Sequence, residues 1–204
     1  MSQTIDTVIF DLGGVLIDWN PDYVFDRFFK DAAQKKHFYR HICTSDWNEE
    51  QDAGRSIQEA TEELVARHPG WEDAIRAYYG RWEEMLGGAI GETVEILQRL
   101  REAGRHRLYA LTNWSAETFP VALERYEFLH WFEGIVVSGE EKTRKPFPVF
   151  YEILFQRYAV DPSSALFIDD NARNVEAGRL LGLHTVHFRS SAQLAAELAA
   201  KNIL

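Results

Sequence analysis

Hydrophobic residues along the chain fall into two patterns, short runs of β-favouring residues and longer stretches with helical spacing. A short run without polar alternation is typical of a strand that is covered on both faces, as in a parallel sheet. On this basis we predict strands at residues 7–10, 107–111, 134–138, 165–168 and 184–188.

Helical patterns lie between these predicted strands. In residues 92–103, Ile96, Leu97 and Leu100 share one helix face, and Gly104 then provides a residue suited to a helix C-cap. Further helices are predicted at residues 147–158, 172–181 and 192–200. The alternation of strands and helices predicts an α/β fold, a doubly wound parallel sheet with right-handed crossovers.

One segment interrupts this alternation, because residues 19–91 show helical patterns and no convincing strand. The segment holds four of the six tryptophans of the chain, namely Trp19, Trp47, Trp71 and Trp82. We interpret it as an all-helical cap inserted after the first strand. The predicted organisation is a core made of residues 1–17 and 92–204 and a cap made of residues 18–91.

Composition and charge restrict the classes of function. The 204 residues are 46% hydrophobic and carry a net charge of −10, so neither nucleic acid nor an anionic membrane is expected as a partner. No apolar run is long enough to span a bilayer, and the polar N-terminus is unlike a secretory signal. The single cysteine, Cys43, cannot form an internal disulfide, which favours a reducing, cytoplasmic compartment.

Polar residues follow four of the predicted strands. Ligands of open parallel sheets bind at the carboxyl ends of the strands. These positions hold Asp11, then Thr112 and Asn113, then Lys145, and finally Asp169 and Asp170. Carboxylate oxygens suit Mg²⁺, and a hydroxyl and a lysine ammonium suit a phosphate group. The sequence therefore predicts a magnesium and phosphate site at this edge of the sheet.

The same segments resemble the four signature motifs of the haloacid dehalogenase superfamily. They read FDLGGVL, LTN, RKP and FIDDN, and they occur in the order of the superfamily. Each motif alone is weak, but four in order at strand ends are specific. The resemblance covers nearly the whole chain, and the helical insert matches the position of the superfamily's C1-type cap. It implies a hydrolase that acts on a small phosphate ester.

The resemblance also implies roles for individual residues. Asp11 matches the nucleophile that attacks phosphorus and forms an aspartyl-phosphate, and it also matches a metal ligand. The carbonyl of Gly13 and the carboxylate of Asp170 match ligands of Mg²⁺. Asp169 matches a residue that ligates the metal directly or through water.

Three further residues match groups that handle the transferring phosphoryl. Thr112 and the amide of Asn113 match groups that bind it. Lys145 matches the lysine that offsets charge between the nucleophile and the phosphate. A dianionic phosphate needs such cations if it is to approach several carboxylates.

Gly13 is a departure from the usual phosphatase pattern. Phosphatases of the superfamily usually carry a second aspartate at this position, and that residue protonates the leaving group and then activates water. General acid–base groups contribute about 10²–10⁴-fold to a rate. The departure resembles a subgroup with DLGNV- or DLGGV-type motifs that includes sugar-1-phosphate phosphatases. Asp18 is one candidate for the missing acid, and the simpler interpretation is that Asp18 caps a helix or is solvated.

Aromatic residues provide candidates for a substrate pocket. Trp19 and Trp114 closely follow motif positions, and Trp47 lies in a polar stretch, TSDWNEEQDAGR, that is suited to reach down from the cap. These three are the predicted substrate-binding aromatics. The other aromatics of the cap are expected in its core, including Tyr78, Tyr79 and Trp82.

Three functions remain open at this point. The first is a magnesium-dependent phosphomonoester hydrolase whose substrate is a small phosphorylated metabolite, such as a sugar phosphate. The second is a 2-haloacid dehalogenase, which uses the same nucleophile on carbon without a metal. Dehalogenases carry small polar residues in place of the acidic pair, so Asp169 and Asp170 favour the phosphatase. The third is a non-catalytic phosphate- or metal-binding protein. The physiological substrate and the oligomeric state stay open.

Overall fold

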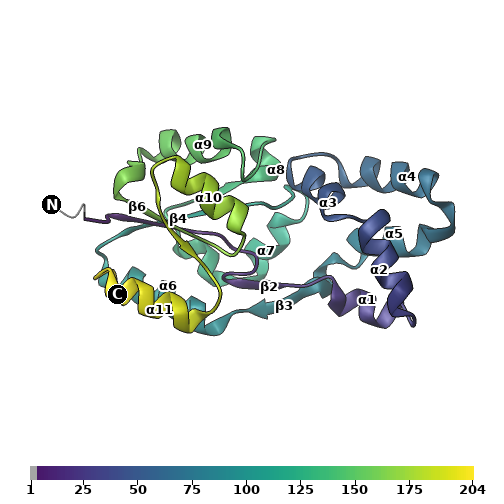
Figure 1. Ribbon diagram of the computed structural model, residues 1–204, viewed down its shortest axis with the longest axis horizontal. Helices are drawn as coiled ribbons and strands as arrows, with labels where there is room; N and C mark the ends of the chain where they lie inside the picture. Colours follow the sequence, from purple (N-terminus) through teal and green to yellow (C-terminus); the bar gives the residue numbers. More distant parts are fainter. Residues whose placement is uncertain (1–3) are drawn as a thin grey trace.

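A five-stranded parallel sheet forms the centre of the larger part of the molecule (Figure 1). The computed structural model describes residues 4–204. The strand order is β5-β4-β1-β6-β7, and all four neighbouring pairs are parallel. The strands are β1 (Thr7–Phe10), β4 (Arg107–Thr112), β5 (Gly134–Val137), β6 (Ala165–Asp169) and β7 (His184–His187). The predicted strands are confirmed, and each boundary lies within one residue of its prediction.

Helices cover both faces of this sheet. Helices α6 (Gly91–Ala103) and α11 (Ser191–Ala200) lie on one face, and α9 (Pro148–Tyr158) and α10 (Ala172–Leu180) lie on the other (Figure 1). The remaining helices of this part are α7 (Phe119–Arg125), the short α8 (Ser138–Glu141), and the 3-10 segments η3 (Glu127–Trp131) and η4 (Pro162–Ser164). The doubly wound α/β fold is thereby confirmed.

The burial of β1 explains its unbroken hydrophobic run. Val8 and Phe10 belong to the hydrophobic cluster on one face of the sheet, and Ile9 belongs to the cluster on the other. Successive side chains of a strand point to opposite faces, so both clusters require apolar residues. Helix α6 ends where predicted, because Gly104 adopts the left-handed conformation (φ 61°) that favours glycine at a helix C-terminus.

Five helices form the smaller part of the molecule, at the right of Figure 1. They are α1 (Asp22–Phe28), α2 (Ala32–His41), α3 (Ser45–Asp52), α4 (Ile57–Arg67) and α5 (Glu72–Gly80), followed or linked by the 3-10 segments η1 (Pro69–Trp71) and η2 (Trp82–Met85). Phe25 lies at the centre of their packing and contacts the rings of Phe38, Tyr39 and Tyr78. We refer to these five helices as the cap.

Two short strands join the cap to the larger part, and one of them corrects the sequence analysis. Strands β2 (Ile17–Trp19) and β3 (Leu86–Ala89) pair in an antiparallel manner. The expectation that residues 19–91 contain no strand is therefore wrong over Leu86–Ala89. The segment reads LGGA, and two glycines in four residues leave neither the length nor the β-branched content that marks a strand. We call β2 and β3 the connecting strands.

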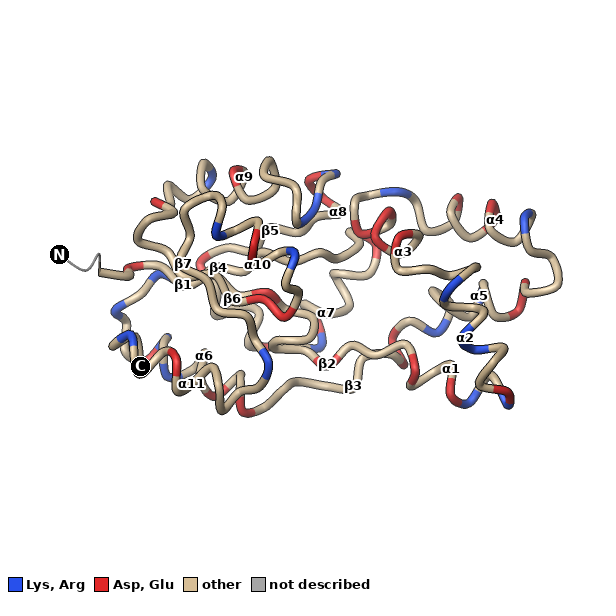
Figure 2. The backbone as a smooth tube through the Cα atoms, in the orientation of Figure 1, with Lys and Arg blue, Asp and Glu red and all other residues tan. Residues whose placement is uncertain are grey.

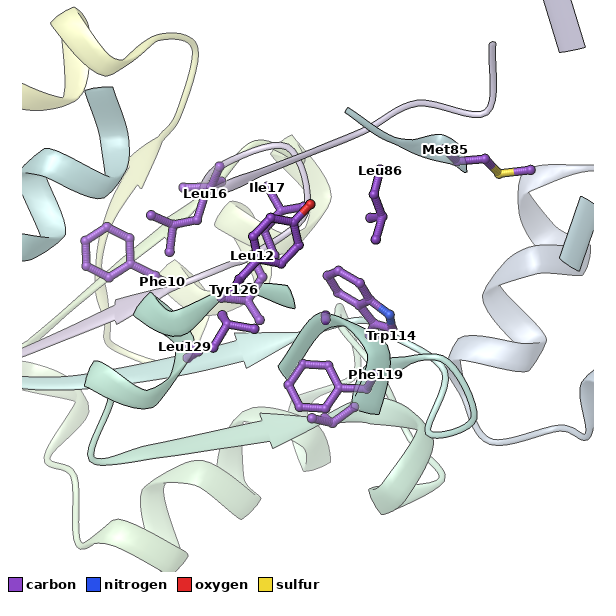
Figure 3. Close-up of a cluster of buried hydrophobic side chains, with 14 of the residues drawn as sticks. Phe10, Leu12, Leu16, Ile17, Met85, Leu86, Trp114, Phe119, Tyr126 and Leu129 are labelled. Atoms are coloured by element: carbon purple, nitrogen blue, oxygen red, sulfur yellow. The ribbon is translucent and has the colours of Figure 1, made fainter. Parts of the chain in front are cut away.

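One continuous hydrophobic cluster extends from the sheet into the cap. Figure 3 shows its middle portion, where Leu12 and Ile17 lie close to Leu86 and Trp114. Met85, just before β3, is fully buried in the same cluster. The predicted boundary between residues 17 and 18 therefore falls within the connecting strand β2, where apolar packing is uninterrupted.

Charged residues lie mainly on the outer helices, where acidic and basic residues are interspersed (Figure 2). An acidic pair also lies at the end of β6, at the carboxyl edge of the central sheet, where Asp169 is the last residue of the strand and Asp170 follows it. Within residues 4–204 no helix is both long enough and apolar enough to cross a membrane.

Candidate active site

The four motifs meet at the carboxyl edge of the sheet. Asp11 follows β1, the central strand, and Thr112 and Asp169 are the last residues of its two neighbours, β4 and β6. Asp170 comes directly after β6. Because β1 pairs with both neighbours in parallel register, these residues come together at one end of the sheet.

Three carboxylates and one ammonium form the centre of the site. One ligand oxygen from each of Asp11, Asp169 and Asp170 lies within 4.8 Å of the others. The Nζ atom of Lys145 lies 2.9 Å from Asp11 Oδ1 and 2.7 Å from Asp169 Oδ2, and its side chain is fully buried. One ammonium against three carboxylates leaves two unbalanced negative charges. Hard oxygen ligands that carry two excess negative charges fit a divalent cation such as Mg²⁺.

The protonation of these groups shows the same charge excess. Burial raises the pKa of Asp11 well above its usual value, Lys145 opposes the rise, and Asp169 adds to it. Burial and the neighbouring Asp169 also raise the pKa of Asp170. Burial alone would lower the pKa of Lys145, but Asp11 and Asp169 outweigh it and raise that pKa. A further cation beside Asp11 and Asp170 would lower their pKa values and favour their ionised forms.

Asn113 holds Lys145 in place. Its Oδ1 accepts a hydrogen bond from the Lys145 backbone N–H at 2.9 Å, and its Nδ2 donates to the Lys145 carbonyl at 3.0 Å. Both polar atoms of the side chain are therefore engaged in positioning the lysine. The resemblance implies that Asn113 contacts a phosphoryl group, and its backbone N–H is the group left for that contact.

Asp169 is held from several directions. Its Oδ2 accepts from Lys145 and its Oδ1 accepts from the Asn171 backbone N–H at 2.7 Å. Asn174 Nδ2 lies 3.1 Å from both carboxylate oxygens. Asn174 was not predicted from the sequence. Its signal is its place in the first turn of the helix after the acidic pair, on the side that faces back toward the strand end.

Thr112 has a buried hydroxyl without a partner. The residue is fully buried, and Oγ1 makes no hydrogen bond within residues 4–204. A buried hydroxyl left unpaired costs about 1–3 kcal/mol. A ligand oxygen at this strand end would satisfy it, which agrees with the phosphoryl contact that the resemblance implies for Thr112.

A cavity of about 240 Å³ lies over this centre, between the sheet and the cap. The larger part of the molecule lines it with Asp11, Gly13, Gly14, Asn113, Trp114, Thr118 and Asp170. Trp19 from β2 and four side chains from the cap region complete it, namely Asn48, Asp52, Tyr79 and Trp82. Six of the residues singled out from the sequence therefore line the cavity, and Thr112, Lys145 and Asp169 lie buried behind its wall.

Two of the three predicted pocket tryptophans line the cavity, and three other aromatic residues are placed differently from their predictions. Trp19 and Trp114 line the cavity, whereas Trp47 packs against the rings of Tyr78 and Tyr79 and is not part of the lining. Tyr79 and Trp82, which were expected in the cap core, line the cavity instead. The pattern of apolar residues identifies which aromatics are buried, but not which of them border a cavity between two parts of the fold.

Asn48 and Asp52 were also missed, although the polar stretch around Trp47 was identified. They are four residues apart on α3 and share one face of the helix, so both border the cavity while Trp47 points elsewhere. The i, i+4 pair of polar residues next to a buried tryptophan was the signal available.

Asp18 lies apart from this cavity. It belongs to β2, and its carboxylate accepts a hydrogen bond from the Tyr23 hydroxyl. The interpretation of Asp18 as a helix cap is wrong, because α1 begins after Pro21 and Asn20 Oδ1 accepts from the Asp22 backbone N–H. Asp18 is not part of the cavity lining either.

Known proteins resemble this chain over nearly its whole length. A sesquiterpene phosphatase of Aspergillus oryzae is 26% identical over 97% of this chain and 97% of its own length. A D-ribitol-5-phosphate phosphatase of Bacteroides thetaiotaomicron is 24% identical and covers 95% and 97% of the two chains. A crystal structure of a haloacid dehalogenase family enzyme from the same bacterium, in complex with magnesium and inorganic phosphate, shares the fold. It has a TM-score of 0.68 at 21% identity and covers 91% of this chain and 95% of that one.

The family assignment rests on a match to a family model as well as on the motifs. The model of haloacid dehalogenase-like hydrolases matches residues 5–182, which include all four motifs and the cap. With the sheet, the acidic centre and the buried lysine in the expected places, the chain belongs to the haloacid dehalogenase-like hydrolases.

Proposed function

We propose that the protein is a magnesium-dependent phosphomonoester hydrolase that acts through an aspartyl-phosphate on Asp11. The observation that carries the proposal is the buried centre in which Lys145 contacts both Asp11 and Asp169 while Asp170 lies beside them. Its excess of two negative charges calls for a divalent cation, and a dehalogenase needs none. The phosphatases among the relatives support the same reaction class.

The hydrogen bonds of Asp11 support its role as nucleophile. Oδ1 accepts from Lys145 Nζ at 2.9 Å and from the Leu12 backbone N–H at 2.7 Å. Both bonds hold the same oxygen, which supports attack on phosphorus by Oδ2. In the proposed reaction Lys145 offsets the charge of both the nucleophile and the incoming phosphate, and the Thr112 hydroxyl and the Asn113 backbone N–H bind the phosphoryl oxygens.

The metal would be held by Asp11, the Asp170 carboxylate and the Gly13 carbonyl. We assign Asp169 to contact through water, because both of its oxygens already accept hydrogen bonds from Lys145, Asn171 and Asn174. When bound, Mg²⁺ supplies positive charge that neutralises the carboxylates and stabilises charge on the transferring phosphoryl.

The substrate that we propose is a small phosphorylated metabolite, such as a sugar phosphate. The cavity of about 240 Å³ combines aromatic rings with the hydrogen-bonding side chains of Asn48, Asp52 and Thr118. Ring faces with a few polar groups suit a compact ligand that has both apolar faces and hydroxyls. One relative is named for a polar substrate, ribitol phosphate, and another for apolar ones, the sesquiterpenes, and a ligand with hydroxyls and apolar faces lies between them in polarity.

We further propose a cytoplasmic location. The support is the single cysteine, Cys43, which is free and buried, and whose pKa burial raises. A chain with one buried thiol needs no oxidising compartment to fold. Imaging of a tagged full-length chain in its native cell tests this location.

Turnover of p-nitrophenyl phosphate with added Mg²⁺, compared between the wild type and Asp11→Asn, tests the function. We expect the amide to reduce turnover more than about 10³-fold, because it is too weak a nucleophile toward phosphorus. Asp46→Asn is the matched control, since Asp46 is exposed on α3 and should leave the rate unchanged. In Asp170→Ala, half-maximal activity should require more Mg²⁺, because a direct carboxylate ligand is lost.

Three results would contradict the proposal. Phosphate hydrolysis by Asp11→Asn near the wild-type rate would exclude the aspartyl-phosphate. Release of halide from 2-chloropropionate in the presence of a chelator would favour the dehalogenase. Phosphate or Mg²⁺ binding with no turnover of any ester would favour a non-catalytic protein.

A further inference from the structure

The geometry points to Asp52, a residue of the cap, as the general acid and base that replaces the carboxylate missing at Gly13. This inference rests on the proposed phosphatase function and adds a catalytic residue to it. Asp52 lines the same cavity as Asp11 and Asp170. The cavity of about 240 Å³ is bordered by both carboxyl groups, so we place the leaving group of an ester bound to Asp11 on the side of Asp52.

Asp52 is the one carboxyl of the lining that has no other role in the proposed reaction. The lining contains three carboxyl groups, of which Asp11 is the proposed nucleophile and Asp170 a proposed metal ligand. The earlier candidate, Asp18, is bound to the Tyr23 hydroxyl and lies outside the lining. The acid–base function therefore falls to Asp52.

Contacts between α3 and the core fix the position of Asp52. It is the last residue of α3, and its carbonyl accepts a hydrogen bond from the Ser138 hydroxyl. Ser138 Oγ in turn accepts from the Trp114 backbone N–H at 2.9 Å. Gly54 allows this close approach, because a Cβ there would lie 2.8 Å from the Gly139 carbonyl oxygen. The end of the helix is thereby docked on the strand ends that carry the site.

Hydrogen bonds orient the carboxyl group itself. Asn48 Nδ2 donates to Asp52 Oδ2 at 3.1 Å, and Asn48 Oδ1 accepts from the Tyr79 hydroxyl at 3.0 Å. All three side chains border the cavity. Asn48 thus holds Oδ2, and the backbone of Ser115 also interacts with the carboxyl group, so the group is fixed at the border of the cavity.

The surroundings of Asp52 favour the protonated form that an acid needs. No ion pair to Asp52 occurs within residues 4–204. Arg144 is the arginine that acts on the pKa of Asp52, and its guanidinium is paired with Glu49 at 2.7 Å. Glu49 also pairs with Arg173 at 2.8 Å. A carboxylate at the C-terminal end of a helix is further disfavoured by the helix dipole.

These effects place the titration of Asp52 near neutrality. Burial raises the pKa of Asp52 to about 7, Glu49 adds to the rise, and Arg144, Lys145 and the backbone of Ser115 oppose it. The phenols of Tyr78 and Tyr79, which face it from α5, are neutral because burial raises their pKa values. A pKa near 7 allows a carboxyl group to give and to take a proton at the working pH.

The two steps balance with Asp52 as follows. In the first step Asp11 bonds to phosphorus, the bond from phosphorus to the leaving oxygen breaks, and Asp52 gives its proton to that oxygen, which leaves as an alcohol. In the second step the Asp52 carboxylate takes a proton from a water whose oxygen bonds to phosphorus. The bond between phosphorus and Asp11 then breaks, which releases phosphate, a carboxylate at Asp11 and a protonated Asp52.

A series of ring-substituted phenyl phosphates with graded leaving-group pKa tests this role at nearly constant substrate shape. We expect Asp52→Asn to lower kcat/KM about 10²–10⁴-fold for the poorest leaving groups and less than about tenfold for the best. For poor leaving groups the wild-type kcat/KM should fall as the pH rises past about 7, since the acid is then deprotonated, and Asp52→Asn should lack this fall. Asp46→Asn, on the same helix, is the control.

Two further variants make the result decisive. Asp52→Asn keeps the shape and the acceptor for Asn48, and Asp52→Ala is measured beside it so that either folded protein answers the question. A second carboxylate introduced by Gly13→Asp into the Asp52→Asn protein should restore hydrolysis of the poor leaving groups, because a Cβ at Gly13 meets no atom within 4 Å.

The outcomes separate this inference from the proposed function. Equal losses across the series, or no loss, would overturn the role of Asp52 while the wild-type turnover upholds the phosphatase. An effect on KM alone would mark Asp52 as a substrate-binding residue and also overturn the role. A wild type that hydrolyses no member of the series with Mg²⁺ would overturn both.

Discussion

Two neighbouring glycines in the first motif differ sharply in what they tolerate. Gly13 has open space where a side chain would begin, whereas a Cβ at Gly14 would lie 2.4 Å from Asp170 Oδ2. Gly14 also has a φ of 74°, which disfavours any residue with a Cβ. No steric contact therefore explains why residue 13 lacks a carboxylate. At position 14, in contrast, the proposed metal ligand Asp170 leaves no room for a side chain.

This contrast predicts different effects of Gly13→Ala and Gly14→Ala. The first should leave the thermal midpoint within a few degrees of the wild type. The second should destabilise the fold by about 1–2 kcal/mol, because of its positive φ. It should also raise the Mg²⁺ concentration for half-maximal activity, since the methyl group displaces Asp170. Magnesium titrations and thermal unfolding of both variants check this, and equal titrations would contradict it.

The residues of the site differ in how far the sequence reveals them. Asp11 and Asp170 directly follow β1 and β6, and the parallel register alone brings these strand ends together, whereas Lys145 comes after α8 and is positioned by Asn113. Asn48 and Asp52 come from another part of the chain, and their place depends on how α3 docks on Ser138. Asp52 and Ser138 are 86 positions apart, so no local sequence pattern predicts this contact.

At the scale of elements, the hydrophobic pattern predicts strands and helices where each is long and buried on a regular face. The central strands alternate between two hydrophobic clusters, and α6 presents a single apolar face, so both were predicted. The connecting strand β3 has no such signal, because only Leu86 of its four residues is buried. It exists because β2 pairs with it.

Two tryptophans of the cap region, Trp47 and Trp82, are expected to have different roles, one in stability and the other in substrate choice. Trp47 packs against Tyr78 and Tyr79 behind the cavity, whereas Trp82 lines the cavity and contacts Trp114 at 5.7 Å between ring centroids. Trp47→Ala should cost about 3–5 kcal/mol of stability and lower the turnover of all substrates alike. Trp82→Ala should change the ranking of substrates more than it changes hydrolysis of p-nitrophenyl phosphate.

Stability curves and a panel of phosphorylated metabolites measure both effects. The division of roles fails if Trp47→Ala reorders the panel while its stability stays at the wild-type value. It fails equally if Trp82→Ala reduces every rate by one common factor.

At the scale of the whole molecule, the cap and the central sheet share one hydrophobic cluster. The cluster continues from Phe10 and Leu12 through Ile17 and Leu86 to Phe25 and Phe38 (Figure 3 shows its middle). Separate cores would be expected if the two parts were independent folding units. The insert can be located from the sequence, but the pattern of apolar residues does not reveal that the hydrophobic core of the cap joins that of the central sheet.

The shared cluster predicts a single unfolding transition. Chemical denaturation can be followed by tryptophan fluorescence, to which the cap region contributes three of the six tryptophans, Trp47, Trp71 and Trp82, and by far-ultraviolet circular dichroism, which reports on the whole chain. We expect the two midpoints to coincide. Two separated transitions, with the fluorescence change at lower denaturant, would mark the cap as an independent unit.

The connecting strands also hold together the two ends of the segment that forms the cap. Trp19 pairs with Leu86, and the Asn20 backbone N–H donates to the Met85 carbonyl at 2.9 Å, so the chain leaves and returns at one place. A segment with its ends held together behaves as a closed loop, whose closure entropy changes by only about 0.6 kcal/mol for each doubling of length. Between these two strands, the cap can therefore lengthen or shorten at little cost in closure entropy while the strand that leads to Asp11 keeps its register.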